Sequence, residues 1–114
     1  MRYVPVGVSG LMVSAVGVGC NAFGSRIDAE ETRAVVEGAL DAGITLFDTA
    51  DSYGAGASEE LLGRALGSRR SDVIVATKFG MGDHEAEHFG AHGGRPHLAG
   101  RLHPECRRPR HESA

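Results

Sequence analysis

Three residues with proton-carrying side chains follow two apolar runs in the sequence. Lys78, the only lysine of the chain, ends a strand-like run that begins at Asp72. A second apolar run, Ile44–Phe47, is followed directly by Asp48, and Tyr53 lies just beyond it. A carboxylate, a phenol and an ammonium at the ends of strands predict a proton-transfer site, with Asp48, Tyr53 and Lys78 as its candidate catalytic residues.

These three groups complement one another if the strands bring them together. A free phenol has a pKa of about 10, which is too high for efficient proton donation at neutral pH. A neighbouring ammonium favours the phenolate and makes the phenol a better donor. We expect Asp48 to orient Lys78, and Tyr53 to protonate an oxygen that gains negative charge, as a carbonyl oxygen does when hydride attacks its carbon. The hydride must come from a cofactor, because no side chain supplies one.

Each residue also has a simpler structural explanation. An Asp after a buried strand is often a turn former, a Tyr-Gly pair is often a turn, and a Lys that ends a strand is often solvated. The joint spacing of Asp48, Tyr53 and Lys78 favours the site over three unrelated structural roles.

The strands that would position this site are short and rich in apolar residues. Arg2–Val6 and Leu11–Ser14 flank a turn that contains glycine, which predicts a β-hairpin. Continuous apolar runs of this length are typical of buried parallel strands. The runs with this pattern are Ala15–Gly19, Ile44–Phe47 and Val73–Thr77.

Two helices are predicted between these strands. Asp28 and Glu31 have the spacing of a capping box, and Gly43 lies where a helix needs a left-handed residue after its end. Ser58 is the predicted N-cap of the second helix, which Gly67 ends. Apolar spacing predicts two buried faces, formed by Ala29, Thr32, Val36, Ala39 and Leu40 and by Leu61, Leu62, Ala65 and Leu66.

The order hairpin, strand, helix, strand, helix, strand predicts an α/β fold with a parallel sheet. Chemistry in such sheets takes place at the carboxyl ends of the strands. Asp48, Tyr53, Lys78 and the turn Gly19–Asn21 all lie at those ends, so we expect them to share one edge.

The same segments resemble the aldo-keto reductases, in particular their bacterial branch. The resemblance rests on Phe47–Gly54 (FDTADSYG), on Ser58–Leu66 (SEELLGRAL) and on Val73–Gly80 (VIVATKFG). The opening residues, Val8–Ser14 and Gly17–Gly24, are also similar to that branch. Nearly all of residues 1–80 is covered.

The resemblance implies the N-terminal part of a (β/α)8 TIM barrel that binds NADPH and reduces small aldehyde or ketone carbonyls. It implies a catalytic tetrad of Asp, Tyr, Lys and His, of which Asp48, Tyr53 and Lys78 match three. It also implies cofactor contacts from Gly19, Cys20, Asn21 and Asp48.

The chain departs from the family's pattern in two respects. The fourth tetrad residue, a His at the end of a further apolar strand, has no counterpart. Such barrels need about 250 residues, and outer strands without neighbours favour aggregation or self-association. We therefore expect a truncated form that is inactive by itself. The alternative is a non-enzymatic βα fragment that acts by pairing its open sheet edge.

Residues 81–114 have a different composition from residues 1–80. They contain all six His and three of the four Pro, with few apolar residues, which predicts a disordered tail. A shift of reading frame between Phe79 and Pro96 would explain this change, and a natural disordered extension is the alternative. His84–His88 fits the short zincin pattern H-E-x-x-H, but nearby glycines disfavour a helix. We expect weak metal binding at most and predict no dedicated metal site.

Composition excludes several other classes of partner. A formal net charge of −3 and the absence of Trp argue against nucleic acid. No apolar run approaches the roughly 20 residues that span a bilayer. Cys20 and Cys106 match no CxxC or zinc-ribbon spacing, and a reducing, cytoplasmic location is the expectation. Leu11–Cys20 has some features of a signal peptide, but glycine and proline interrupt it.

Overall fold

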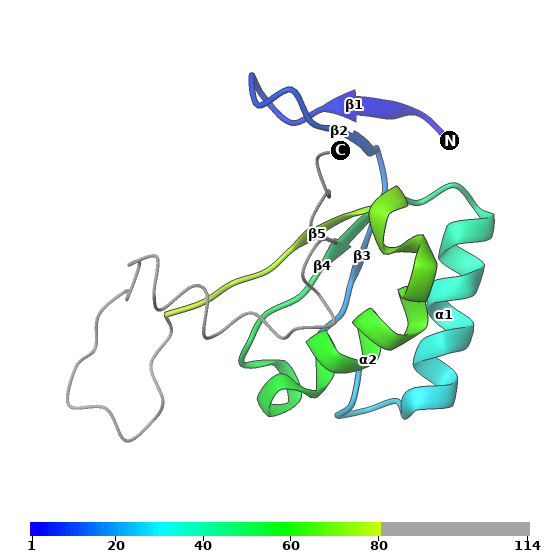
Figure 1. Ribbon diagram of the computed structural model, residues 1–114, viewed down its shortest axis with the longest axis vertical. Coiled ribbons are helices and arrows are strands. Elements are labelled where there is room, and N and C mark those ends of the chain that lie inside the picture. Colours follow the sequence, from blue (N-terminus) through cyan, green and yellow to red (C-terminus); the bar gives the residue numbers. More distant parts are fainter. Residues whose placement is uncertain (81–114) are drawn as a thin grey trace, which may run out of the picture.

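A computed structural model of the chain describes residues 1–80 (Figure 1). It contains a two-stranded hairpin, a three-stranded sheet, two α-helices and two short 3-10 segments. The element order is the predicted one. The elements are β1 (Tyr3–Pro5), β2 (Met12–Ser14), β3 (Gly17–Gly19), α1 (Ala29–Asp41), β4 (Leu46–Asp48), η1 (Tyr53–Gly56), α2 (Ala57–Leu66), η2 (Gly67–Asp72) and β5 (Ile74–Ala76).

The three-stranded sheet is parallel, with the order β3-β4-β5. In its register Gly19 lies opposite Asp48, and Asp48 lies opposite Ala76. Because parallel strands with crossover helices present all their carboxyl ends on one side, the residues after each strand are neighbours. The predicted parallel α/β fold is confirmed.

The hairpin lies at the amino ends of the strands of this sheet. β1 and β2 pair antiparallel, as predicted. The backbone N–H of Ser14 donates to Thr45 Oγ1 and that of Thr45 donates to Ser14 Oγ, both at 2.9 Å. The hydroxyl of Tyr3 donates to the carbonyl of Gly43, also at 2.9 Å. Since Gly43 and Thr45 lie just before β4, the hairpin is fixed at the amino ends of the sheet and not at its carboxyl ends (Figure 1).

Helix α1 begins at the predicted capping box. The Glu31 N–H donates to Asp28 Oδ1 at 2.8 Å, and the Asp28 N–H donates to Glu31 Oε1 at 3.4 Å. Gly43 follows the helix with a φ of 84°, the left-handed conformation that glycine adopts without strain. Four of the five predicted face residues are buried. Ala29 is not, because it lines an open groove beside the first turns of both helices.

The predicted start of helix α2 is wrong by two residues. Its N-cap is Gly56, with a φ of 98°, and not Ser58. Ser58 is fully buried, and its hydroxyl bonds to groups outside the helix. The predicted end at Gly67 is confirmed. On the predicted face, Leu62 and Leu66 are buried, and Leu61 and Ala65 are half-buried.

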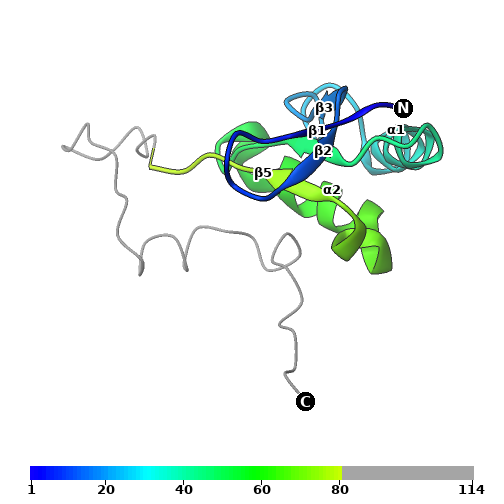
Figure 2. The same ribbon diagram turned by 90° about the horizontal axis from the view of Figure 1, so that it is seen from above.

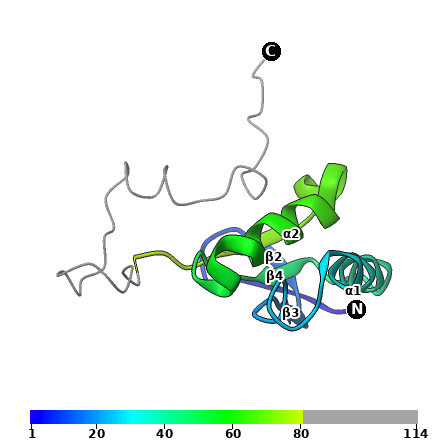
Figure 3. The same ribbon diagram turned by 90° about the horizontal axis from the view of Figure 1, so that it is seen from below.

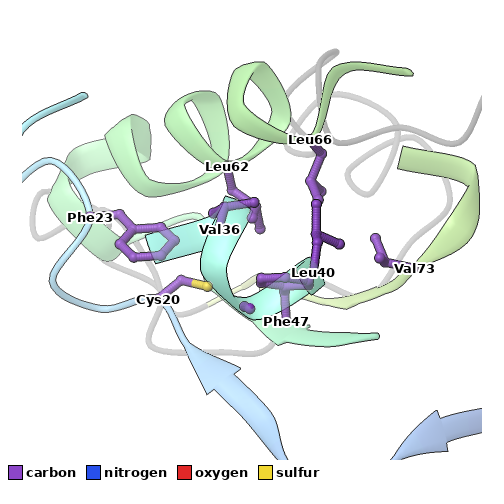
Figure 4. Packing of buried hydrophobic residues seen from close by; sticks show 9 residues of the cluster. Cys20, Phe23, Val36, Leu40, Phe47, Leu62, Leu66 and Val73 are labelled. Atoms are coloured by element: carbon purple, nitrogen blue, oxygen red, sulfur yellow. The ribbon is translucent and has the colours of Figure 1, made fainter. Parts of the chain in front are cut away.

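Both helices lie on the same side of the three-stranded sheet, and all three views agree on this (Figures 1, 2 and 3). Leucines of α2 meet residues of α1 and of the strands in one apolar cluster (Figure 4). Burial of such side chains is the main stabilising term of a domain of this size. The buried members are Cys20, Phe23, Val36, Ala39, Leu40, Phe47, Leu62, Leu66 and Val73.

Neither helix of the described part, residues 1–80, has the length and apolar character required to cross a bilayer.

Replacing Leu62 by Ala should destabilise the chain by about 2–5 kcal/mol, because a fully buried leucine leaves a cavity between the two helices. Urea unfolding followed by circular dichroism measures this change. Val35, an exposed residue of α1, provides the control, and Val35→Ala should change stability by less than about 0.5 kcal/mol. Equal effects of both substitutions would contradict the packing described here.

Candidate active site

The ammonium of Lys78 joins the three predicted catalytic residues. Lys78 Nζ donates to Asp48 Oδ1 at 2.7 Å and to the hydroxyl oxygen of Tyr53 at 3.2 Å. It also donates to the carbonyl of Thr49 at 3.1 Å. An ammonium has three N–H donors, so each of them has an acceptor and the orientation of the group is fixed. The sequence-based expectation that these side chains converge is confirmed in geometry.

Backbone hydrogen bonds beyond the regular ladder bring the strand ends together. The N–H of Cys20 donates to the carbonyl of Asp48 at 2.8 Å, and the N–H of Thr49 donates to that of Ala76 at 2.8 Å. One step further, the N–H of Asp51 donates to the carbonyl of Lys78 at 3.1 Å. Asp48 at the end of β4 and Lys78 on the extension of β5 are therefore neighbours, although 29 residues separate them in the sequence.

A left-handed turn places Tyr53 over the same edge. Gly54, Ala55 and Gly56 have φ values of 60°, 54° and 98°. Ala55 is the only residue other than glycine with a positive φ in residues 1–80, a conformation that costs energy and is enriched at functional sites. A Cβ on Gly54 would lie 3.3 Å from the carbonyl oxygen of Phe23, so the turn packs tightly against the loop after β3. The turn directs Tyr53 back towards Lys78.

The electrostatics of the site favour the charged lysine. The hydrogen bond to Asp48 raises the pKa of Lys78 above its ordinary value of 10.5, and Tyr53 adds to this effect, while desolvation partly opposes it. The Asp48 and Lys78 side chains remain about half exposed, at 53% and 48%. Lys78 Nζ also lies 4.9 Å from the centre of the Tyr53 ring, within the range of a cation–π contact. The three groups form a half-open, solvent-accessible site.

The predicted cofactor residues lie at the end of β3, next to Asp48. Gly19 is exposed and has open space where a side chain would project. Asn21 is exposed as well. Cys20 is fully buried, and its thiol donates to the carbonyl of Val18 at 3.5 Å. A ligand at this edge can therefore reach Gly19 and Asn21, but not the Cys20 side chain.

Four polar residues beside the site were missed by the sequence analysis. Thr49 and Thr77 are each adjacent in sequence to a predicted catalytic residue, and their hydroxyls bond to Ser58 and Glu59 of α2. Ser58 was predicted only as the N-cap of the second helix, and Glu59, in the first turn, has the position of an ordinary helix-dipole partner. Because a Ser-Glu pair at the start of a helix fits that interpretation equally well, the pattern alone did not indicate their burial.

The predicted metal pattern at His84–His88 and the disordered tail lie outside the described residues. Within residues 1–80, no group of His, Cys, Asp and Glu is arranged to hold a metal ion.

A parallel α/β sheet with an acid, a phenol and an ammonium at its carboxyl edge has the architecture of a segment of a TIM barrel. The family model of the aldo/keto reductases matches residues 15–99. The chain belongs to the aldo/keto reductase family.

Relatives of known sequence agree with this assignment. The chain is 43% identical over 86 residues to a probable voltage-gated potassium channel β subunit of rice, and 40% identical over 80 residues to the oxidoreductase YqkF of Bacillus subtilis. It is 42% identical over 94 residues to the versiconal hemiacetal acetate reductase of Aspergillus parasiticus. These matches cover 72%, 70% and 73% of this chain. The chain spans about a quarter of the length of these relatives, 26–27%.

Solved structures give the same fold. The holo form of an aldo-keto reductase from Bacillus halodurans is similar with a TM-score of 0.71 and 34% identity, over 86% of this chain and 33% of that one. An aldo-keto reductase from Pseudomonas aeruginosa is similar with a TM-score of 0.69 and 34% identity, over 87% of this chain and 38% of that one. The described residues form part of a TIM barrel and not a closed barrel.

Replacing Asp48 by Asn should lower the pKa of Lys78, because it removes the charged acceptor that raises this pKa most. Because the pKa is raised in the folded chain, the interaction stabilises the fold below pH 10.5 and its contribution is lost as the pH rises through the raised value. Competitive acetylation at several pH values, read by mass spectrometry, measures the pKa of this single lysine.

The control for this titration is Asp72→Asn, which removes an exposed carboxylate paired with Arg69. It should leave the acetylation profile of Lys78 unchanged. Identical profiles for the wild type and Asp48→Asn would show that the Asp48–Lys78 bond does not form in solution.

Proposed function

We propose that Asp48, Tyr53 and Lys78 form the proton-donating part of a site that reduces aldehyde or ketone carbonyls with NADPH. The observation that carries this proposal is the ammonium of Lys78, which donates to Asp48 and to the phenol oxygen of Tyr53 at once. A phenol in contact with a fixed cation is suited to donate its proton to an oxygen that becomes negative.

The residues present fit a reduced nicotinamide at this edge. Gly19 leaves open space directly opposite Asp48 in the register of the sheet, where a flat ring requires an unobstructed surface. Asn21 is exposed beside it and offers an amide that can pair with a carboxamide. Gly19, Asn21 and the Asp48 side chain are the groups proposed to hold the cofactor. Cys20 would contribute only by supporting them, because its thiol is buried.

Each of the three catalytic residues has a distinct task in this proposal. The cofactor, when bound, supplies the hydride. Asp48 keeps Lys78 charged and oriented through their 2.7 Å hydrogen bond. Lys78 stabilises the phenolate that Tyr53 becomes, through the 3.2 Å contact between Nζ and the phenol oxygen. Tyr53 donates the proton from its hydroxyl to the carbonyl oxygen of the substrate, which lies on the solvent side of the site.

We propose further that the 114-residue chain does not turn over carbonyl substrates by itself. Residues 1–80 contribute three parallel strands, where a TIM barrel has eight, and three of the four tetrad groups. The similarity to an Aspergillus parasiticus reductase supports a carbonyl substrate for the site as a whole. A reducing, cytoplasmic setting would suit the buried thiol of Cys20.

NADPH should raise the thermal unfolding midpoint of the chain, while no carbonyl-dependent oxidation of NADPH is detected. Stabilisation by a ligand that binds only the folded chain follows its concentration relative to its dissociation constant. Differential scanning fluorimetry and the absorbance of the reduced nicotinamide measure the two quantities.

A matched pair of glycine substitutions tests the location of the cofactor. Gly19→Val fills the open space beside Asp48 and should abolish the NADPH-dependent shift. Gly38→Val adds the same side chain in open space on α1 and should retain the shift. If NADPH has no effect on the unfolding midpoint of the wild type, the cofactor proposal fails, and rapid turnover would refute the proposed inactivity.

The open edges of the sheet favour a second candidate function, a non-enzymatic pairing module. Within residues 1–80, β3 and β5 pair only with β4, so both present an unpaired backbone edge. We expect concentration-dependent self-association, measured by light scattering coupled to size-exclusion chromatography. A single monomeric species over a roughly hundredfold range of concentration would exclude this candidate, because such a range takes a pair of fixed affinity from mostly free to mostly associated.

A further inference from the structure

Ser58 of α2 connects two strand ends through its buried side chain. Its hydroxyl donates to the carbonyl of Cys20 at 2.7 Å, at the end of β3. The Thr49 hydroxyl, just after β4, lies 2.8 Å from the same oxygen. Because the proton of Ser58 is committed to Cys20, the Thr49 hydroxyl is the donor in this second bond. Ser58 and Thr49 are both fully buried, at 0% exposure.

Glu59, the next residue of α2, holds the third strand end. Its carboxylate accepts a hydrogen bond from the Thr77 hydroxyl at 2.5 Å, directly after β5. The side chain is 2% exposed, and a buried carboxylate costs free energy unless it is hydrogen-bonded. The neighbouring Glu60 instead pairs with Arg64 on the helix surface. Two adjacent acidic residues therefore have different environments and different tasks.

The partners of Ser58 and Glu59 are all neighbours of candidate site residues. Thr49 follows Asp48, and its own carbonyl accepts a hydrogen bond from Lys78. Thr77 precedes Lys78, and Cys20 follows Gly19. One turn of α2 thus fixes the three strand ends that carry the carboxylate, the ammonium and the open glycine surface.

Helix formation does not account for these contacts. The N-cap is Gly56, which makes no side-chain cap bond, and the Ser58 hydroxyl bonds to Cys20 and Thr49 instead. Buried polar groups stabilise a fold little in net terms, but they restrict it to one arrangement when each group is satisfied. The contacts of Ser58 and Glu59 with the ends of the three strands hold this edge of the sheet together, and these contacts are called the clamp below.

We propose that Ser58 and Glu59 are positioning residues that hold Asp48 and Lys78 within hydrogen-bonding distance. This inference rests on the proposed function only for the assignment of Asp48 and Lys78 as catalytic residues. The clamp contacts themselves involve neither cofactor nor substrate. Loss of either clamp contact should weaken the bond between Asp48 and Lys78 while the apolar core stays intact.

The single lysine makes the test specific. Trace acetylation below pH 10 labels only the unprotonated fraction of Lys78, and the α-amine of Met1 serves as the internal reference. Ser58→Ala and Thr77→Val should each increase the labelling of Lys78 relative to Met1 by about twofold or more, since reactivity follows the unprotonated fraction. Alkylation of the buried Cys20, measured in the same samples, reports whether the core has opened.

Matched variants separate positioning from packing. Thr77→Ser keeps the hydroxyl and loses a methyl group, so it should retain the labelling of the wild type, whereas a packing role would make Ser worse than Val. Ser68→Ala, at an exposed serine of η2, should have no effect.

Two outcomes would overturn the proposal. The first is unchanged Lys78 labelling in both Ser58→Ala and Thr77→Val. The second is an increase in Lys78 labelling that occurs only in variants whose Cys20 is alkylated, or that Thr77→Ser also shows. Either result would make the contacts purely structural. Because no cofactor is needed, a positive result together with absent NADPH binding would retain the clamp and reject the proposed function.

Discussion

The ammonium of Lys78 is the group on which the geometry of the site depends. Its Nζ contacts Asp48 at the end of β4, the carbonyl of Thr49 directly after it and the phenol of Tyr53 at the same time. With three donors and three acceptors it tolerates only one arrangement of its neighbours. The parallel register supplies that arrangement, because Asp48 and the extension of β5 lie side by side only when β4 and β5 are aligned as observed.

The rest of the described structure supports this alignment from two ends. At the amino end, the reciprocal bonds between Ser14 and Thr45 attach the hairpin to the start of β4. At the carboxyl end, buried side chains from the first turn of α2 attach to all three strands. Between the two ends, the apolar cluster fixes the helices against the sheet (Figure 4). A site on the surface therefore has a rigid base, which is what the proposed proton transfer would require.

Different parts of the site have different stability. The Asp48–Lys78 pair is half exposed, and such pairs contribute little to folding free energy. The contacts beneath it are buried, so they are the ones that resist displacement. This division would suit the proposed site, in which Asp48 and Lys78 are accessible to ligands and the buried contacts beneath them are not.

The sequence by itself determined the order of elements, the capping box at Asp28, the end of α2 at Gly67 and the identity of the three converging residues. Local periodicity and turn-forming residues depend only on neighbours in the sequence, so they can be recognised without the structure. It did not determine the role of Ser58, which the pattern assigned to a cap, or the burial of Glu59 and Cys20. Only the tertiary structure decided these, since a polar residue is buried when its partners come from distant strands, and no local pattern records that pairing. The left-handed conformation of Ala55 was not predicted for the same reason: the neighbouring Gly54 packs against the loop after β3, a contact that the local sequence does not indicate.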